Sequence, residues 1–308
     1  MKFLWITDPW NTLDHESDTT LRLMQEAALL GHTSYWCDVH SIRLEQEKGL
    51  LDAALFDPSQ AHWDMHQNAF PVDDFKSIQY RVDPPVDQAY LHPLQILEAT
   101  RGGAEIVNAA PLLFSCNEKW EGLLIPGLSP PCVISSDRET LLKFAKREGK
   151  CVLKPLHTAQ SKGIELIDAK HLSNAIDSLK NATSNFKLPI ELQKFLPGIT
   201  EGETRLWFTD GKLIGVVRKL PVRGDFKVDI DRGSLVKAHA LDAREKKASV
   251  KIAAHLKKRK IRLAAVDLIE GLISDFNITS PGLIVQMEKA LQKNLSQAII
   301  RCLASKRS

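Results

Sequence analysis

The sequence predicts an α/β fold (mixed α+β) that contains both parallel and antiparallel sheet. In the first hundred residues, short apolar runs alternate with a helical pattern, which is typical of a mainly parallel sheet. From residue 201 onward, apolar runs are paired across two-residue turn signals, which is typical of antiparallel hairpins. A chain of 308 residues is long for one compact unit, so we expect two or three subdomains.

The N-terminal part is expected to form strand, helix and strand in turn. Asp18 precedes a pattern of apolar residues at three- and four-residue steps, and Gly31 ends this predicted helix. Strands are expected at residues 2–7, 33–37 and 78–82. The region 40–75 is rich in Asp, His, Gln and Pro, and we expect loop and edge strand there.

The middle of the chain is expected to begin a new segment with a helix at 117–124. A capping-box pattern at 136–139 opens another helix, which Gly149 closes. The other predicted elements are strands at 151–155, 163–167 and 189–196, and a short helix at 172–179.

The C-terminal part is expected to contain two hairpins and two helices. The first hairpin turns at Asp210-Gly211 between strands at 204–209 and 212–219. Helices are expected at 242–260 and 283–303. The basic run 257–260 ends the first of these helices, where cations complement the helix dipole; a phosphate-binding patch is the alternative.

Composition argues against several classes of protein. The net charge of +3 is too small to indicate a nucleic-acid partner. The sequence has no apolar run of about 18 residues, so we expect no membrane span. The N-terminus becomes polar too soon for a secretory signal. Five cysteines without a C-x-x-C pair disfavour a zinc site or a disulfide framework, and a reducing cytoplasm fits best.

The second hairpin, at 261–282, carries the most informative polar pattern. Asp275 and Asn277 are two residues apart, so they share one face of a strand, and Asp267 lies at a similar height on the partner strand. Three oxygen-bearing side chains on an otherwise apolar ribbon suit Mg²⁺. A solvent-facing acidic hairpin would give the same pattern.

The turn of this hairpin decides whether Asp267 joins the shared face. A strict two-residue loop at Glu270-Gly271 would pair Asp267 with Ser274 and turn it away from Asp275. A three-residue loop with Gly271 in the left-handed region, or a β-bulge, would restore a common face.

Cations recur on several separate segments. Lys154 closes an apolar strand, so it is either an edge residue that reaches solvent or a phosphate ligand. The small polar stretch 157–163 could fold over phosphates, but it lacks the P-loop pattern. The other candidates, each of which could be an ordinary surface charge, are Arg81, Lys119, Arg205 and Arg218. Together they suit a polyphosphate and an anionic substrate, with catalysis by positioning and charge neutralisation.

Six ordered segments resemble the bacterial glutathione synthetases, which are ATP-grasp ligases. They lie at 3–9, 80–87, 116–119, 153–155, 193–197 and, in the hairpin, 266–268 with 277–281. The resemblance implies an ATP-grasp fold with an N-terminal parallel-sheet (pre-ATP-grasp) domain. The implied units are 1–116 for that domain, 117–200 for a central lid subdomain, and 201–308 for a C-terminal subdomain with the metal site.

The same resemblance implies roles for individual residues. Lys119 and Lys154 would contact ATP phosphates, while Gln193, Lys194, Phe195 and Leu196 would border the adenine and Glu203 would lie near the ribose. Asp267, Asp275 and Asn277 would bind Mg²⁺, with Mn²⁺ as a substitute. Arg81 and Arg205 would contact the substrate or an acyl-phosphate, and Lys227 would partly replace an arginine of the family's substrate loop.

In the ligases that the chain resembles, ATP phosphorylates a carboxylate, and an amine then displaces phosphate to give an amide. For glutathione synthetase, the acid is γ-glutamylcysteine and the amine is glycine. The resemblance also implies a cytoplasmic homo-oligomer that uses small-molecule substrates and binds neither nucleic acid nor membrane.

Three departures from the family's pattern leave alternatives open. The loop at 157–163 lacks the family's run of glycines, the substrate loop at 222–229 has a different sequence, and Asp275 stands where the family has Glu. One alternative is therefore a ligase for another acid and amine. Another is a catalytically weak paralogue that binds nucleotide.

Overall fold

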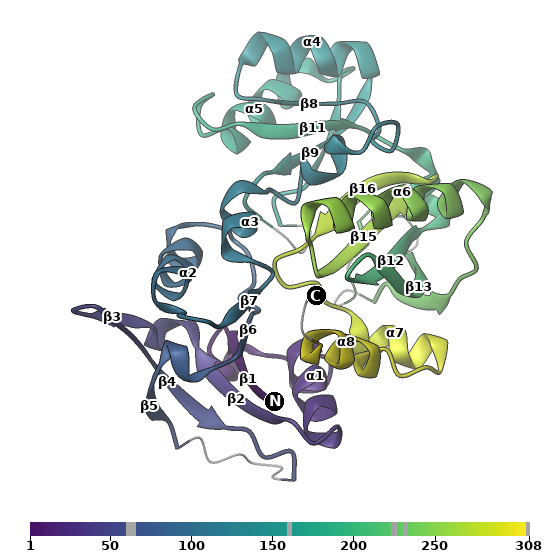
Figure 1. Ribbon diagram of the computed structural model, residues 1–308. Coiled ribbons are helices and arrows are strands. Elements are labelled where there is room, and N and C mark those ends of the chain that lie inside the picture. Colours follow the sequence, from purple (N-terminus) through teal and green to yellow (C-terminus); the bar gives the residue numbers. More distant parts are fainter. Residues whose placement is uncertain are drawn as a thin grey trace.

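The computed structural model describes residues 1–59, 66–158, 162–222, 224, 227–228, 230 and 233–305. Within these ranges the chain forms three β-sheets, each covered by helices (Figure 1). The fold is therefore mixed α/β, as the sequence predicts. No helix in the described part of the chain is both long enough and apolar enough to cross a bilayer.

The first sheet lies in the N-terminal third, with strand order β3-β4-β2-β1-β6-β7 and β5 paired to β4. Its strands are β1 (Lys2–Thr7), β2 (Thr33–Asp38), β3 (Arg43–Glu45), β4 (Lys48–Leu55), β5 (Asn68–Pro71), β6 (Ser77–Tyr80) and β7 (Glu105–Val107). The pairs β1–β2, β1–β6 and β6–β7 are parallel, whereas β4 pairs antiparallel with β2, β3 and β5. The parallel prediction thus holds for half the sheet, and the region 40–75 contains more strand than the loop and edge strand expected.

Helices cover both faces of this sheet. Successive side chains of β1 point to opposite sides, so each face carries apolar side chains that pack against a helix. Phe3 and Trp5 pack with helix α1 (Thr19–Leu29). Leu4 and Ile6 pack instead with helix α2 (Gln88–Thr100). Asp18 caps α1 by accepting a hydrogen bond from the backbone of Leu21 at 2.9 Å, as its position in the sequence predicts. A short helix, α3 (Ala110–Ser115), leads into the second sheet.

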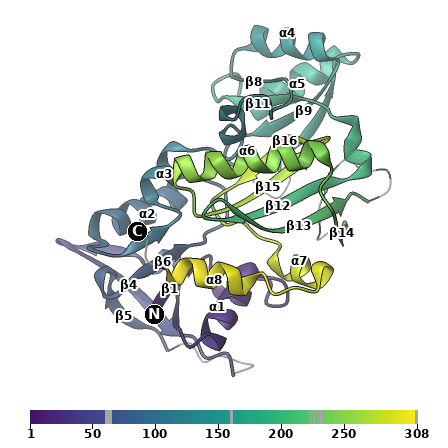
Figure 2. The same cartoon turned by 45° about the vertical axis from the view of Figure 1, so that its right-hand side comes forward.

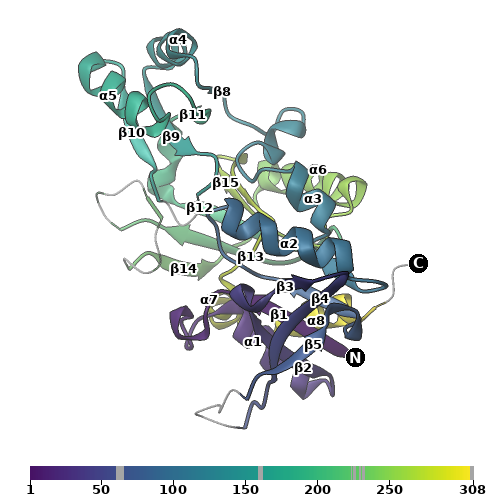
Figure 3. The ribbon, with the colours of Figure 1, turned by 90° about the vertical axis from the view of Figure 1, so that its left-hand side faces the viewer.

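The second sheet is small and antiparallel, with order β10-β9-β11-β8. It consists of β8 (Cys132–Ser135), β9 (Lys150–Pro155), β10 (Glu165–Asp168) and β11 (Ile190–Lys194). Helices α4 (Arg138–Glu148) and α5 (Leu172–Ala182) cover its outer face (Figures 1 and 3). Leu141, Phe144, Leu153 and Leu192 belong to the apolar core between them. The inner face of the sheet remains available to a site.

The third sheet has order β14-β13-β12-β15-β16. Its strands are β12 (Glu203–Thr209), β13 (Lys212–Leu220), β14 (Leu235–Ala238), β15 (Leu263–Ile269) and β16 (Leu272–Asn277). Helix α6 (Ala243–Arg259) crosses one face (Figure 2), and Asp242 with Glu245 forms a complete capping box at its start. Helices α7 (Ile284–Leu291) and α8 (Ser296–Ala304) lie on the other face, in one core with α1.

Two predicted helices are wrong in detail. The helix expected at 283–303 is divided into α7 and α8, because Gln292 adopts a positive φ of 48° and Glu288 accepts a hydrogen bond from the backbone of Ser296 at 2.8 Å. The helix expected at 117–124 is a turn followed by a 3₁₀ helix at Glu121–Leu124. The side chain of Asn117 accepts the Lys119 N–H at 2.9 Å and so competes with the helical hydrogen-bond pattern.

The proposed division of the chain at 116 and 200 stays a prediction. Each sheet lies within one of the three proposed units. However, α7 and α8 from the last unit pack against α1 from the first, so the C-terminus returns to the N-terminal sheet (Figure 1).

Candidate active site

A cavity of about 740 Å³ is lined by residues from all three sheets. Except for Arg218, every residue that the sequence proposed for the site lines this cavity, from Arg81 to Asn277. The geometry therefore brings together side chains that lie almost 200 residues apart in the chain. It does not by itself assign a role to any of them.

The hairpin of β15 and β16 places its three oxygen-bearing side chains on one face. Ile269 pairs with Leu272 across a two-residue loop, and both loop residues have positive φ values, 55° at Glu270 and 78° at Gly271. The register then shifts, so that Asp267 lies opposite Asp275. The β-bulge that the sequence analysis required is therefore present, next to a strict two-residue loop.

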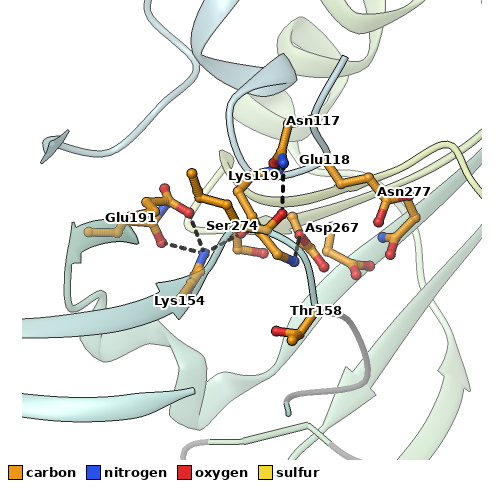
Figure 4. A network of polar contacts seen from close by, with 12 residues as sticks. Asn117, Glu118, Lys119, Lys154, Thr158, Glu191, Asp267, Ser274 and Asn277 are labelled. Atoms are coloured by element: carbon orange, nitrogen blue, oxygen red, sulfur yellow. Dashed lines mark hydrogen bonds and ion pairs between the residues drawn. The ribbon is translucent and has the colours of Figure 1, made fainter. Parts of the chain in front are cut away.

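The bulge also supplies a hydrogen-bond acceptor for a lysine of the neighbouring sheet. Ser274 is the extra residue, and its carbonyl oxygen accepts a hydrogen bond from Lys154 Nζ at 2.6 Å. Lys154 also donates to Gln193 Oε1 at 3.1 Å, and its Nζ lies 3.8 Å from Glu191 Oε2. Figure 4 shows this lysine reaching from the second sheet to the hairpin. Lys154 is only 6% exposed, so it is no solvent-reaching edge residue.

Asp267 is held between two cations. Arg205 donates to both of its carboxylate oxygens, at 2.9 and 2.6 Å, and Lys219 Nζ lies 3.0 Å from Oδ2. Burial would raise the pKa of Asp267, but the charges of Arg205 and Lys219 outweigh it and hold that pKa well below its usual range. Lys219 also forms an ion pair with Glu203 at 2.5 Å. Burial raises the pKa of Glu203, although the charge of Lys219 opposes this rise.

Asp275 carries a single ion pair, with Lys119 Nζ at 2.7 Å. Burial opposes ionisation of Asp275, yet Lys119 and Lys154 together lower its pKa. The neighbouring Asn277 donates its side-chain N–H to the carbonyl oxygen of Ala265 at 3.1 Å, which leaves the amide oxygen as the acceptor available to the cavity. The charges of both lysines thus act on one of the proposed metal ligands, Asp275.

The donor chemistry of the hairpin fits a hard divalent cation. Two carboxylates and an amide oxygen converge there, and Mg²⁺ favours such oxygen ligands. No group of three or more His, Cys, Asp or Glu side chains in the described ranges is arranged to hold a metal ion. A metal at the hairpin would therefore depend on Asn277 as well as on the two carboxylates.

Arg81 joins the first sheet to the segment that follows the β15–β16 hairpin. It is 5% exposed and donates to Thr20 Oγ1 at 3.1 Å and to the carbonyl oxygen of Pro281 at 3.0 Å. Burial lowers the pKa of Arg81, although Asp18 and Asp83 nearby oppose this shift. Lys227 lines the same cavity.

The segment after β11 supplies apolar surface. Leu196 forms a small cluster with Ile199 and Ile269, and Phe195 packs against it. Such a cluster suits the flat face of an aromatic ring. Lys194 also lines the cavity, but its Nζ lies 3.4 Å from Glu148 Oε2 on α4, so its charge is directed to the outer layer.

Two polar loops are only partly described. In the stretch 157–163, the described residues Thr158 and Lys162 line the cavity, and Gly163 has a φ of +73°. Residues 159–161 lie outside the described residues. In the loop 222–229, residues 223, 225, 226 and 229 also lie outside them.

Sequence reasoning chose the wrong cation on β13. Arg218 faces away from Asp267 and donates to Glu245 Oε1 at 3.1 Å, whereas Lys219 faces the cavity. A register shift after Trp207 inserts one extra residue into β13, and a shift of one residue exchanges the two faces of a strand. The predicted two-residue turn alone could not reveal this.

Sequence reasoning also missed Glu191 and Glu118, which are 1% and 8% exposed. Glu191 lies two residues before Gln193, so the alternation of a strand already placed both on one face. Glu118 stands next to Lys119, but nothing local indicated its partners.

Comparison with known proteins agrees with this geometry. Residues 1–113 match the N-terminal domain of prokaryotic glutathione synthetase, and residues 118–292 match its ATP-grasp domain. A glutathione synthetase from Prochlorococcus marinus (strain MIT 9313) is 30% identical over 99% of both chains. One from Vibrio parahaemolyticus is 25% identical over 94% of both chains.

Solved structures agree on the fold. A D-cycloserine synthetase superposes with a TM-score of 0.67 at 16% identity and covers 98% of this chain and 99% of its own. A RimK-domain ATP-grasp protein from Sphaerobacter thermophilus gives a TM-score of 0.66 at 13% identity, covering 99% of this chain and 100% of its own. With both domains matched in order, the chain belongs to the prokaryotic glutathione synthetase family of ATP-dependent C–N ligases and has the ATP-grasp fold.

Proposed function

We propose that this chain joins γ-glutamylcysteine and glycine through an amide bond at the expense of ATP. The observation that carries the proposal is the convergence of two lysines with two carboxylates and an amide in one cavity. Lys119 and Lys154 lie beside Asp275 and the hairpin carbonyl of Ser274. Buried cations next to hard oxygen ligands suit a triphosphate with its metal ion.

The proposed reaction has two balanced steps. A carboxylate oxygen of the acid bonds to the terminal phosphorus of ATP, the bond from that phosphorus to ADP breaks, and ADP leaves. The amine nitrogen then bonds to the acyl carbon and loses a proton, while inorganic phosphate leaves. Both steps move negative charge between oxygens, so fixed cations are the main contribution required of the protein.

In this proposal Lys119 and Lys154 bind phosphate oxygens, and Arg205 with Arg81 and Lys227 orients the acid. Mg²⁺, with Mn²⁺ as a substitute, would be held by Asp267, Asp275 and Asn277 and would neutralise phosphate charge. The adenine would lie against the apolar cluster of Phe195 and Leu196, bordered by Gln193 and the backbone of Lys194, with Glu203 near the ribose.

Several aspartates favour an acid that also carries an ammonium group. The cavity is lined by Asp8, Asp14, Asp18 and Asp83, and the charges of Asp18 and Asp83 act on Arg81. A zwitterion such as the γ-glutamyl group offers an ammonium to these carboxylates and a carboxylate to the arginine. A different acid and amine is the second candidate, supported by Lys227 at a cavity position where the family has arginine.

The test is release of inorganic phosphate from ATP with γ-glutamylcysteine plus glycine, compared with other acids and amines. We expect the named pair to give the highest kcat/KM. Mg-ATP should also raise the melting temperature, because a ligand that binds only the folded state stabilises it. Faster turnover with another pair would support the second candidate, and an unchanged melting temperature with saturating Mg-ATP would contradict both.

We further propose a cytoplasmic homo-oligomer. All five cysteines are free thiols, and two of them, Cys37 and Cys151, are buried, which suits a reducing compartment. Light scattering after size-exclusion chromatography tests the oligomeric state, and a mass of one chain, 34.5 kDa, would contradict it.

A further inference from the structure

The tripeptide Asn117-Glu118-Lys119 contacts parts of the cavity that are far apart in the sequence. Asn117 donates its side-chain N–H to the carbonyl oxygen of Leu156, just after β9, at 2.7 Å. Lys119 pairs with Asp275 on β16 at 2.7 Å. In Figure 4 the Glu118 side chain lies to one side of these two contacts, beside Asn277.

Glu118 binds the turn that follows the metal hairpin. Its Oε1 accepts hydrogen bonds from the backbone N–H of Ile278 at 2.6 Å, from that of Thr279 at 2.9 Å, and from the Thr279 hydroxyl at 2.9 Å. Glu118 is 8% exposed, and a buried carboxylate is costly unless donors surround it. The contact spans about 160 residues of sequence, so it joins two separate segments of the fold.

Ile278, the residue after Asn277, is therefore held at both its N–H and its carbonyl oxygen. Glu118 holds the N–H of Ile278, and the buried side chain of Asn108 donates to the Ile278 carbonyl oxygen at 2.7 Å. Asn108 also donates to the carbonyl oxygen of Leu263, at the start of β15, at 2.8 Å. These bonds restrict how far Asn277 can move relative to β15.

We propose that Glu118 is a positioning residue that fixes the metal ligand Asn277 relative to the phosphate-binding Lys119. The inference rests on the proposed function, because it requires that a metal and a triphosphate share this cavity. Glu118 lines the cavity, but its carboxylate is bound to the backbone and side chain of the turn. It acts through the turn at Ile278-Thr279, as groups that orient the ligands of a metal generally do.

The test measures metal binding without turnover. Mn²⁺ is titrated into the full-length protein saturated with ADP, and free Mn²⁺ is followed by electron paramagnetic resonance. Glu118→Gln keeps an acceptor oxygen but loses the charge, whereas Glu118→Ala loses every bond to the turn. We expect the Mn²⁺ dissociation constant to rise about tenfold or more in Glu118→Ala and less in Glu118→Gln, since loss of such an orienting group costs about 10–100-fold in metal affinity.

A second readout separates positioning from general damage to the fold. The affinity for ADP without metal should change less than about twofold, because Glu118 orients the metal ligand rather than the nucleotide. Glu245→Gln is the matched control. Glu245 is also a buried carboxylate, 3% exposed, and bridges Thr204, Arg218 and helix α6 without lining the cavity. It should lower the melting temperature without changing the Mn²⁺ dissociation constant.

Thr279→Val provides a variant on the other side of the contact. It removes the hydroxyl donor at 2.9 Å and keeps the shape of the side chain. It should weaken Mn²⁺ binding in the same direction, and its effect should disappear in a Glu118→Ala background. This variant keeps the proposal testable even where Glu118→Ala fails to fold.

Three outcomes would overturn the proposal. Wild-type Mn²⁺ affinity in Glu118→Gln, Glu118→Ala and Thr279→Val would remove the positioning role and leave the proposed function standing. An equal loss of Mn²⁺ affinity in Glu245→Gln would show a general effect of destabilisation. Absence of ADP and Mn²⁺ binding in the wild-type protein would overturn the proposed function together with this inference.

Discussion

Replacing Lys154 with methionine should separate the structural role of this side chain from its proposed role in binding phosphate. Lys154 is the cation that pairs with Glu191, whose carboxylate is 1% exposed, at 3.8 Å. Methionine preserves the length and apolar stem of lysine but removes the ammonium. The Lys154→Met protein would therefore bury Glu191 with one neutral donor, Gln193 Nε2 at 3.2 Å.

The size of the effect follows from this burial. Breaking a buried ion pair by removing one partner costs about 3–5 kcal/mol, and a separation of 3.8 Å places this pair at the low end of that range, near 3 kcal/mol. At about 2–4 °C per kcal/mol for a large domain, the melting temperature should fall by about 6–12 °C.

The loss should depend on pH with a definite sign. Burial raises the pKa of Glu191, and the charge of Lys154 opposes this rise, so the pKa rises further in Lys154→Met. The stability deficit relative to the wild type should therefore be absent below the unfolded-state pKa of about 4.3. It should grow as pH rises above the folded-state pKa of Glu191 in the wild type, and it should level off once Glu191 is also ionised in the folded Lys154→Met protein.

The assay is thermal unfolding of the wild type, Lys154→Met, Glu191→Gln and the double variant at about pH 4, below the unfolded-state pKa of Glu, and at about pH 8. Glu191→Gln should restore most of the stability lost in Lys154→Met, because it removes the uncompensated charge. It should not restore affinity for ATP, since the proposed phosphate-binding cation, Lys154, is still absent. A double variant no more stable than Lys154→Met would refute the reasoning, and so would a double variant that binds ATP like the wild type.

Three further predictions concern the hairpin and its support. Asp275→Asn should reduce turnover at least about 100-fold at fixed Mg²⁺, as metal-assisted charge neutralisation contributes several kcal/mol. The melting temperature should also fall, because the buried Lys119 loses its ion-pair partner. Turnover near the wild-type level would contradict the metal assignment. Gly271→Ala should destabilise the protein by about 1–2 kcal/mol in urea unfolding, because Gly271 has a φ of +78°, which strains a residue with a side chain. An unchanged free energy of unfolding would refute the claim that this turn requires glycine. Burial opposes ionisation of Glu121, but His255 and Arg259 hold its pKa at about 2. Glu121→Gln should therefore cost about 2 kcal/mol at neutral pH, and the difference should disappear as pH falls from the unfolded-state pKa toward about 2; a constant difference across that range would contradict the charge pairing.

The helix starts predicted at Asp18 and Asp242 were confirmed, and both side chains accept a backbone N–H from the first turn of the helix. The helix expected after the capping-box pattern at 136–139 also forms, but its cap is Asp137, which accepts the Thr140 N–H, rather than Ser136. Such caps require only that neighbouring residues meet, so their signals are complete in the sequence. The hairpins at Asp210-Gly211 and Glu270-Gly271 were predictable for the same reason.

Partners from distant segments could not be predicted in this way. Glu118 meets Thr279 across about 160 residues, and the division between α7 and α8 depends on Glu288 turning back to Ser296. The region 40–75 gave no alternation clear enough to show β4, which forms because it pairs with β2, β3 and β5.

The sequence by itself determined the family, the ligase chemistry that the family implies, and many of the residues that line the cavity. Only the tertiary structure decided which of these residues face one another. One inserted residue in β13 turns Lys219 rather than Arg218 toward Asp267, and one in β16 presents the Ser274 carbonyl to Lys154. The physical reason is that side chains alternate along a strand, so one inserted residue exchanges the two faces beyond it without changing the residues themselves. Hydrogen bonding and packing between the strands select where such a bulge forms.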